Sequence, residues 1–157
     1  MAATKSKPEL FGKHPLAKAI EPVIDTWAES GYPAVNGKEI TPTTRELFNW
    51  WFSDQVHEPD SFHICQRRAL ETIVYCYEIL GIPLVESLFE TFSSDLLEKE
   101  NLKKGIEKIG HPRFGIKMAT GTGKTWVITA IIIWQYWNRI INEDNRFASH
   151  FLLCAPG

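Results

Sequence analysis

The stretch MATGTGKT, residues 118–125, decides how the rest of this 157-residue sequence is interpreted. It matches a phosphate-binding loop, in which a glycine, four residues of any kind and Gly-Lys-Ser/Thr follow one another, except that Met118 holds the first position. Gly121 and Gly123 can adopt backbone angles that are closed to other residues, so successive amide N–H groups can converge on a phosphate. The alternative is a Gly/Thr-rich turn that binds no nucleotide.

The segments on either side favour the phosphate-binding interpretation. Residues 113–118, RFGIKM, predict a short strand, and residues 125–141 predict a long apolar helix. The N-terminus of that helix carries free donors and a partial positive charge, and it points at the loop. Residues 148–155, ASHFLLCA, predict a second strand. Strand, glycine-rich loop, helix and strand make a βαβ unit, so we expect an α/β fold with a parallel sheet.

Two residues at the end of the loop carry the chemistry that a nucleoside triphosphate needs. Lys124 supplies a mobile ammonium for the β- and γ-phosphate oxygens, and Thr125 places a hydroxyl where Mg²⁺ coordination would need it. We therefore expect Lys124 and Thr125 to be the catalytic pair, with Thr125 as the Mg²⁺ ligand. The expected ATP-binding residues of the loop are Thr120, Gly121, Thr122, Gly123, Lys124 and Thr125.

Upstream of the loop the sequence predicts helices. The segment TPTTRELFNWWF begins with Thr41 as a possible N-cap and Pro42 at the first helical position. The segment FHICQRRALETIVYCYEILG ends at Gly81, a suitable terminator. Residues 83–109 predict two more amphipathic helices, and residues 1–40 predict an irregular arm with one or two short helices. The expected apolar faces are Leu47, Trp50 and Trp51 on the first helix, and Ile64, Leu70, Ile73, Val74, Tyr77 and Leu80 on the second.

Composition sets bounds on these expectations. The chain is 44% hydrophobic, enough for one domain with a real core, and its formal net charge of -2 gives no support for nucleic-acid binding outside a local basic groove. The cysteines, which are Cys65, Cys76 and Cys154, are too loosely spaced for a disulfide framework or a zinc site. The first residues lack the apolar core of a signal peptide, so we expect a cytoplasmic protein.

Three stretches resemble the motifs of one group of motors. MATGTGKT is similar to the first motif of superfamily-two helicases and translocases, in the form found in motor subunits of type I and type III restriction enzymes. CQRRA resembles their Q motif, in which Gln66 would read the adenine edge, and Phe62 could stack on adenine or pack in the core. FLLCAPG resembles motif Ia, in which Pro156 and Gly157 would contact nucleic acid. A buried strand with a Pro-Gly turn is the alternative there.

The resemblance implies a domain organisation and an activity. Residues 62–157 would form the N-terminal part of a RecA-like P-loop NTPase domain, with an incomplete sheet and truncated after motif Ia. Residues 1–61 would form a helical extension. The parent protein would be an ATP-dependent DNA helicase or translocase of the type III restriction enzyme Res-subunit or DEAD/DEAH kind. Its cofactors would be ATP and Mg²⁺, and its partners DNA and a modification or specificity subunit.

The same resemblance limits what this chain is expected to do. No Asp-Glu-x-His motif follows Thr125 in the sequence. We therefore expect the fragment to bind ATP and Mg²⁺ through the loop without hydrolysing ATP alone. The alternatives from other classes are a small P-loop phosphotransferase, such as a nucleoside kinase, and a non-catalytic interaction module in which the loop is vestigial.

Overall fold

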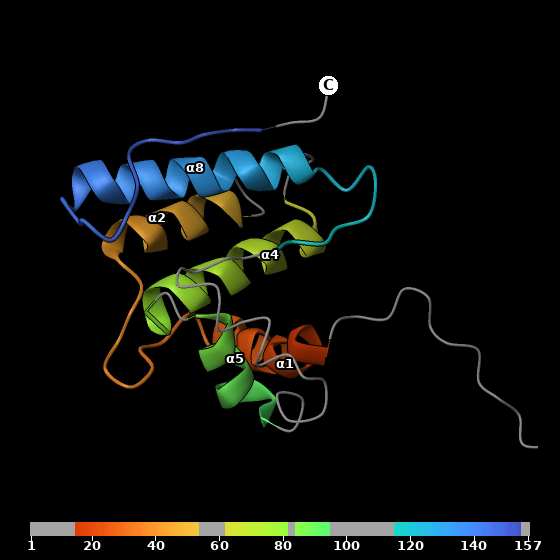
Figure 1. Ribbon diagram of the computed structural model, residues 1–157. Helices are drawn as coiled ribbons and strands as arrows, with labels where there is room; N and C mark the ends of the chain where they lie inside the picture. The colour runs from red at the N-terminus through yellow and green to blue at the C-terminus, as the bar shows by residue number, and fades with distance from the viewer. Residues whose placement is uncertain (1–14, 54–61, 82–83, 95–114, 155–157) are drawn as a thin grey trace, which may run out of the picture.

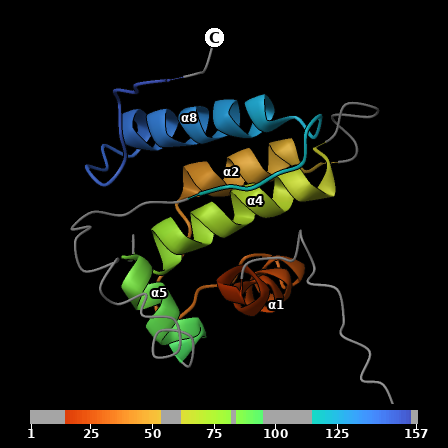
Figure 2. The ribbon, with the colours of Figure 1, turned by 45° about the vertical axis from the view of Figure 1, so that its right-hand side comes forward.

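The computed structural model describes residues 15–53, 62–81, 84–94 and 115–154, and these form a stack of helices (Figure 1). α8 lies beside α2, and α4 packs against α8 (Figure 2). α1 packs against α4 on the side away from α8, and α5 packs against α1. The helices are α1 (Pro15–Glu29), α2 (Pro42–Trp51), α4 (Ile64–Val74) with its π-helical continuation η1 (Tyr75–Ile79), α5 (Val85–Phe92) and α8 (Lys124–Ile141).

The predicted helix boundaries are confirmed where the structure describes them. Thr41 caps α2, since its hydroxyl oxygen accepts from the Thr44 amide at 3.1 Å, and Pro42 occupies the first helical position. Gly81 follows the α4–η1 helix with a left-handed φ of 78°. α5 confirms the first helix expected in 83–109, and most of the remainder of that segment lies outside the described residues. None of the described helices has the length and apolar character needed to cross a membrane.

The predicted strands are not found in the described part of the chain. Residues 115–118 and 148–154 lie outside any strand, and the paired backbone outside the helices is an isolated bridge between Val35 and Lys38. A strand needs a neighbouring strand to accept and donate its backbone hydrogen bonds, and no described segment provides one here. The described structure is therefore mostly helical, and it does not show the α/β sheet. Residues 113–114 and 155 fall outside the described residues.

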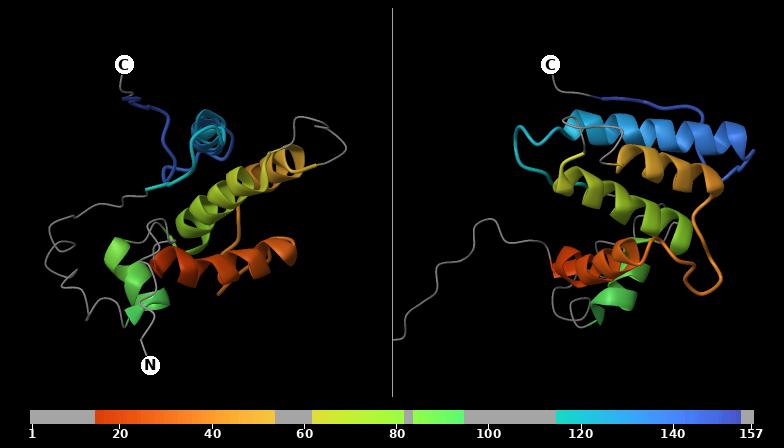
Figure 3. Two further views of the ribbon diagram at one scale, coloured as in Figure 1. Left: turned by 90° about the vertical axis from the view of Figure 1, so that its right-hand side faces the viewer. Right: turned by 180° about the vertical axis from the view of Figure 1, so that it is seen from behind.

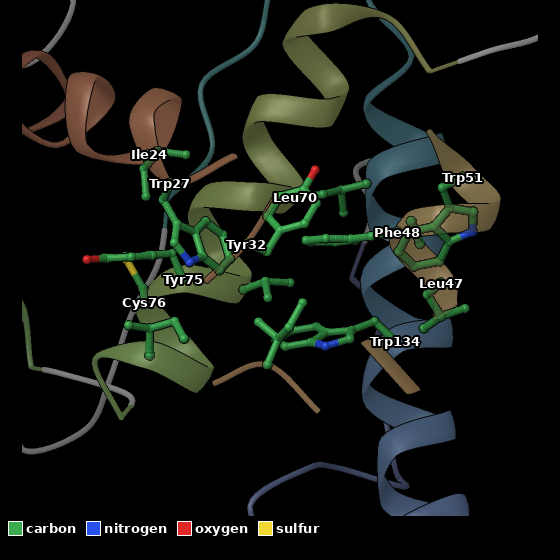
Figure 4. Packing of buried hydrophobic residues seen from close by; sticks show 14 of the residues in the cluster. Ile24, Trp27, Tyr32, Leu47, Phe48, Trp51, Leu70, Tyr75, Cys76 and Trp134 are labelled. Carbon is green, nitrogen blue, oxygen red and sulfur yellow. The ribbon is translucent and has the colours of Figure 1, made fainter. Parts of the chain in front are cut away.

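The core lies on both sides of α4, and Figure 4 shows its packing. Trp27 from α1 meets Tyr32 and Tyr75 edge-on, with ring centroids 5.0 Å apart in both pairs. Across α4, Phe48 from α2 and Trp134 from α8 are each 1% exposed. Leu70 and Val74 of α4, together with Val127 and Ala130 of α8, belong to the same cluster of buried residues.

Two residues expected on apolar faces are exposed instead. Trp50 is 53% exposed and Ile64 is 66% exposed. The buried face of α2 follows the spacing of Thr44, Leu47, Phe48 and Trp51, which is a single helical stripe, and Trp50 falls just outside it. Ile64 is the first residue of α4.

A buried carboxylate joins three of the helical elements. Glu78, in η1, is 1% exposed, and its Oε1 accepts from the Thr44 hydroxyl at 2.6 Å and from the Trp134 indole N–H at 2.9 Å. Its Oε2 accepts from the Thr41 amide at 2.6 Å. Asn138 of α8 completes the cluster by donating to the Thr44 hydroxyl at 3.1 Å. Every group that contacts the Glu78 oxygens is a donor, which is the arrangement that offsets the cost of burying a carboxylate.

Glu78 gives the fold a pH dependence that can be measured. Burial, the largest effect, raises the pKa of this carboxyl, although Thr44, the Thr41 amide, Trp134 and the nearby charge of Arg146 lower it. A carboxyl with a raised folded pKa keeps its proton in the folded state at pH values where the unfolded chain has lost it. Its contribution to stability is therefore present below the ordinary value of 4.5 and is lost as the pH rises through the folded pKa.

We expect the free energy of unfolding of the wild type to fall relative to that of Glu78→Gln as the pH rises through this window. Urea unfolding of both chains at a series of pH values gives the difference directly. The amide of the variant does not titrate, so other carboxylates affect both chains alike. A difference that stays constant, or that grows with pH, would contradict the assignment.

Candidate nucleotide-binding site

The loop before α8 has the backbone geometry that its two glycines were expected to provide. Gly121 and Gly123 have left-handed φ values of 80° and 74°. Gly123 is the N-cap of α8, and its carbonyl accepts from the Trp126 amide at 3.0 Å and the Val127 amide at 3.4 Å. The helix thus begins directly at Lys124, with the first amides of its N-terminus facing the loop.

Two side chains of the loop donate hydrogen bonds to the carbonyl oxygen of Ala119. The Ala119 oxygen accepts from the Thr122 hydroxyl at 2.7 Å and from the Lys124 ammonium at 3.0 Å. Lys124 and Thr125 are both exposed. The ammonium is therefore held by a single carbonyl at the surface, from which it can move to a phosphate oxygen, and the Thr125 hydroxyl lies in the first turn of α8, accessible to a cation.

Gln66 is brought to the loop from α4. Its Nε2 donates to the Thr122 carbonyl at 2.9 Å, and its Oε1 accepts from the His63 amide at 2.9 Å, which caps the start of α4. The N-termini of α4 and α8 consequently lie at the same end of the molecule (Figures 1 and 2). The structure brings Gln66 and the loop together, whereas the proposed contact of Gln66 with adenine stays a prediction. The bond to the Thr122 carbonyl was not anticipated, because no local pattern identifies a partner 56 residues away.

Met118 replaces the first glycine of the usual pattern, and the structure shows what its side chain does. It is half-buried and packs against the hydrophobic core. The residues that surround a phosphate in this motif come later, from Gly121 onward, so an apolar side chain at position 118 anchors the loop without crowding the glycines.

Phe62 and the two arginines next to Gln66 all have partners away from the loop. The Phe62 ring lies 5.9 Å from those of Trp51 and Phe52, measured between centroids. Arg67 pairs with Glu71 at 2.8 Å, and Arg68 forms ion pairs with acidic residues of α1. The arginines thus join α4 to its neighbours within the helix stack.

Arg67 and Glu71 also belong to a second polar cluster, which includes Tyr32. The Tyr32 hydroxyl donates to Glu71 at 2.7 Å and accepts from Arg67 at 3.0 Å. Burial and the adjacent Glu71 carboxylate raise the pKa of the Tyr32 phenol, so it stays a donor. This cluster connects the turn after α1 to α4 and leaves Arg67 no role at the phosphate loop.

The remaining predicted site residues divide between exposed and undescribed positions. Thr120 is exposed at the tip of the loop. Pro156 and Gly157, the expected nucleic-acid contacts, lie outside the described residues. Within the described ranges there is no cluster of His, Cys, Asp and Glu side chains that could hold a metal ion by itself. A cation at this site would therefore depend on Thr125 and on the oxygens of the phosphates.

Taken together, the loop contains the groups that binding of a polyphosphate would use. Left-handed glycines, the amide donors at the start of α8 and an exposed lysine are the groups that a triphosphate requires. A hydroxyl at Thr125 is the ligand that Mg²⁺ needs from the protein in such a site.

Comparison with known families gives one match. The model of the family described as "Type III restriction enzyme, res subunit" matches residues 61–156, which is more than half of the chain. The matched stretch includes Gln66 and the whole loop. Comparison with curated proteins gives no match, and comparison with solved structures gives none.

The two left-handed glycines form a matched pair for mutation. A Cβ added at Gly121 would meet nothing within 4 Å, whereas a Cβ at Gly123 would lie 2.2 Å from Gln66 Nε2. Gly121→Ala should therefore cost only backbone strain, about 1–2 kcal/mol. Gly123→Ala should cost about 2–4 kcal/mol, since the displaced Gln66 amide also loses its bond to the Thr122 carbonyl.

Urea unfolding of both variants measures these costs. In a Gln66→Ala background the excess cost of Gly123→Ala should shrink, because the clashing amide is gone. Equal costs for the two glycines in the wild-type background would show that Gln66 does not approach Gly123 in solution.

Proposed function

Because the chain belongs to the family of type III restriction enzyme res subunits, we propose that residues 118–125 bind ATP with Mg²⁺ in a DNA-translocating motor. The observation that carries this proposal is the loop itself, in which Gly121 and Gly123 are left-handed and Lys124 opens α8. The family gives a helicase-like ATPase as the activity of the parent protein. Binding of the nucleotide by this loop is the step that we add.

In this proposal each loop residue has a distinct role. The backbone amides from Gly121 to Thr125 donate to the phosphate oxygens, and Lys124 leaves the Ala119 carbonyl to neutralise the β- and γ-phosphates. Thr125 contributes its hydroxyl to Mg²⁺. Bound Mg²⁺ would supply charge neutralisation between the phosphates.

The base side of the nucleotide is assigned to the start of α4. Gln66 lies there, within hydrogen-bonding distance of the loop, and an amide can present a donor and an acceptor to a base edge. Stacking of Phe62 on adenine stays a prediction, since the Phe62 ring would have to leave Trp51 and Phe52. In the parent motor, Pro156 and Gly157 would contact DNA, and a modification or specificity subunit would supply target recognition.

We also propose that α8 packs against a parallel sheet in the intact RecA-like domain. α8 buries Val127, Ala130 and Trp134, whereas a second set of its apolar side chains forms an exposed stripe. This exposed stripe is formed by Trp126, Tyr136, Trp137, Ile140 and Ile141. Residues 147–154 turn back alongside α8, as Figures 1 and 3 show, and they end in the exposed apolar residues Phe151, Leu152 and Leu153. Apolar stripes of this kind are normally covered.

The first test is titration of a fluorescent ATP analogue with Mg²⁺ into the 157-residue chain. Lys124→Ala should weaken binding about tenfold or more, because it removes a charge-assisted bond to the phosphates. Lys117→Ala is the matched control, since Lys117 is another exposed lysine close to the loop. Equal binding by both variants would contradict the proposed site.

Hydrolysis gives a separate expectation. The described acidic residues that follow α8 are Glu143 and Asp144, and Asp144 pairs with Arg146 at 2.6 Å. This leaves no acidic motif of the Asp-Glu-x-His kind to orient water beside the phosphates. We expect the chain to bind nucleotide without steady turnover, in an assay of phosphate release. Turnover that depends on Lys124 would contradict this expectation.

The exposed apolar stripe of α8 leads to a third prediction. Trp137→Arg should change the free energy of unfolding of the chain by no more than about 0.5 kcal/mol, because Trp137 is 48% exposed. It should also reduce binding of a hydrophobic dye. Trp134→Arg, one turn away and 1% exposed, should cost several kcal/mol, roughly the 3–5 kcal/mol of an uncompensated buried charge.

The same substitution, made in the complete motor protein, tests whether a sheet covers the stripe. If it does, Trp137→Arg should destabilise that protein strongly, although it leaves the 157-residue chain nearly unchanged. A neutral effect in both proteins would show that the stripe stays exposed.

A further inference from the structure

The Gln66 side chain is committed to two backbone groups within the protein. The residue is 6% exposed, its acceptor atom is used by the His63 amide, and its donor atom is used by the Thr122 carbonyl. One N–H of the amide nitrogen and one lone pair of the amide oxygen are used in these two bonds. In this structure Gln66 therefore acts as a bridge between the first turn of α4 and the loop.

The carbonyl that Gln66 holds belongs to the peptide between Thr122 and Gly123. A peptide is planar and trans, so its carbonyl and its N–H point in opposite directions. Once the Thr122 oxygen is bonded to Gln66, the Gly123 N–H is directed away from α4. That N–H is one of the donors that a loop of this sequence presents to phosphate.

This peptide is also the part of the loop that most needs an external support. It lies between Gly121 and Gly123, whose φ values of 80° and 74° are only two of many that glycine can adopt. A Cβ at Gly123 would lie 2.2 Å from Gln66 Nε2, so the Gln66 amide can keep its present position only beside a glycine. Without the bridge, the peptide could rotate and turn its N–H away from the site.

We propose that Gln66 is a positioning residue for the phosphates: by holding the Thr122 carbonyl, it orients the Gly123 N–H toward a bound polyphosphate. Gln66 then contributes to the affinity for the phosphate chain itself, whether or not a base is present. This inference rests on the proposed function of the loop. It differs from a role in reading adenine, which would affect only ligands that carry the base.

The test uses inorganic tripolyphosphate with Mg²⁺, which has no base, and the full 157-residue chain. Gln66→Met preserves the length of the side chain and removes both the donor to the Thr122 carbonyl and the acceptor for the His63 amide. It should weaken tripolyphosphate binding about two- to tenfold, the equilibrium factor expected for one hydrogen bond. Gln135→Met is the matched control, because Gln135 is also a buried glutamine that accepts from a backbone amide, that of Ala148.

A second measurement separates orientation of the loop from general loss of stability. In the unliganded chain labelled with ¹⁵N, Gln66→Met should shift the Gly123 amide resonance, since the peptide on its N-terminal side loses its partner. The amides of Leu47 and Phe48, in the core of α2, should keep their positions. Gln135→Met should leave the Gly123 resonance unchanged.

The outcomes distinguish this inference from the site on which it rests. Tripolyphosphate binding that is lost in Lys124→Ala but unchanged in Gln66→Met would overturn the positioning role and leave the phosphate site intact. If ATP binding weakened in the same Gln66→Met variant, Gln66 would be a reader of the base alone. Tripolyphosphate binding that is absent, or insensitive to Lys124→Ala, would overturn the phosphate site and the positioning role together.

Discussion

The buried Glu78 carboxylate constrains the arrangement of the helices more tightly than any apolar contact does. Its three donors come from the start of α2 and from the middle of α8, whereas Glu78 itself lies in η1. Apolar side chains tolerate small displacements, but a hydrogen bond weakens steeply with distance and angle. A shift of α8 along α2 would leave the buried carboxyl oxygens without their donors, and that penalty is larger than the loss of a few contacts.

One continuous helix, α4–η1, connects Glu78 to the loop at residues 118–125. The α4–η1 helix begins near Gln66 and ends near Glu78, and it contacts α8 or the loop before it at both places. At one end Glu78 holds Trp134, in the middle of α8. At the other end Gln66 holds Thr122, just before α8 begins. The two bonds fix the N-terminal half of α8 at both ends, so the direction of its first amides is set by tertiary contacts as well as by the loop.

Local patterns explain why some features were predictable and others were not. The cap at Thr41, the terminator Gly81, the left-handed Gly121 and Gly123 and the extent of α8 all depend on a few adjacent residues, and the structure has each of them. The resemblance to known motors assigned Gln66 to the adenine edge and did not predict its contact with the loop, because the spacing of Gln66 and Lys124 contains no information about contact. The burial of Glu78 was not anticipated, since a glutamate in an amphipathic helix normally faces water.

The two predicted strands were not confirmed because a strand forms only beside a neighbouring strand, whatever the preferences of its own residues. Residues 115–118 and 148–154 have the composition of strands, yet a single extended segment leaves its backbone groups for water and gains nothing from cooperative pairing. The exposed stripe of α8, which includes Trp126 and Trp137, is the surface on which the proposed sheet would pack. A covering sheet would satisfy both features at once. The phosphate loop does not need that layer for its own shape, since Gln66 and the cap at Gly123 already hold it from the helical side.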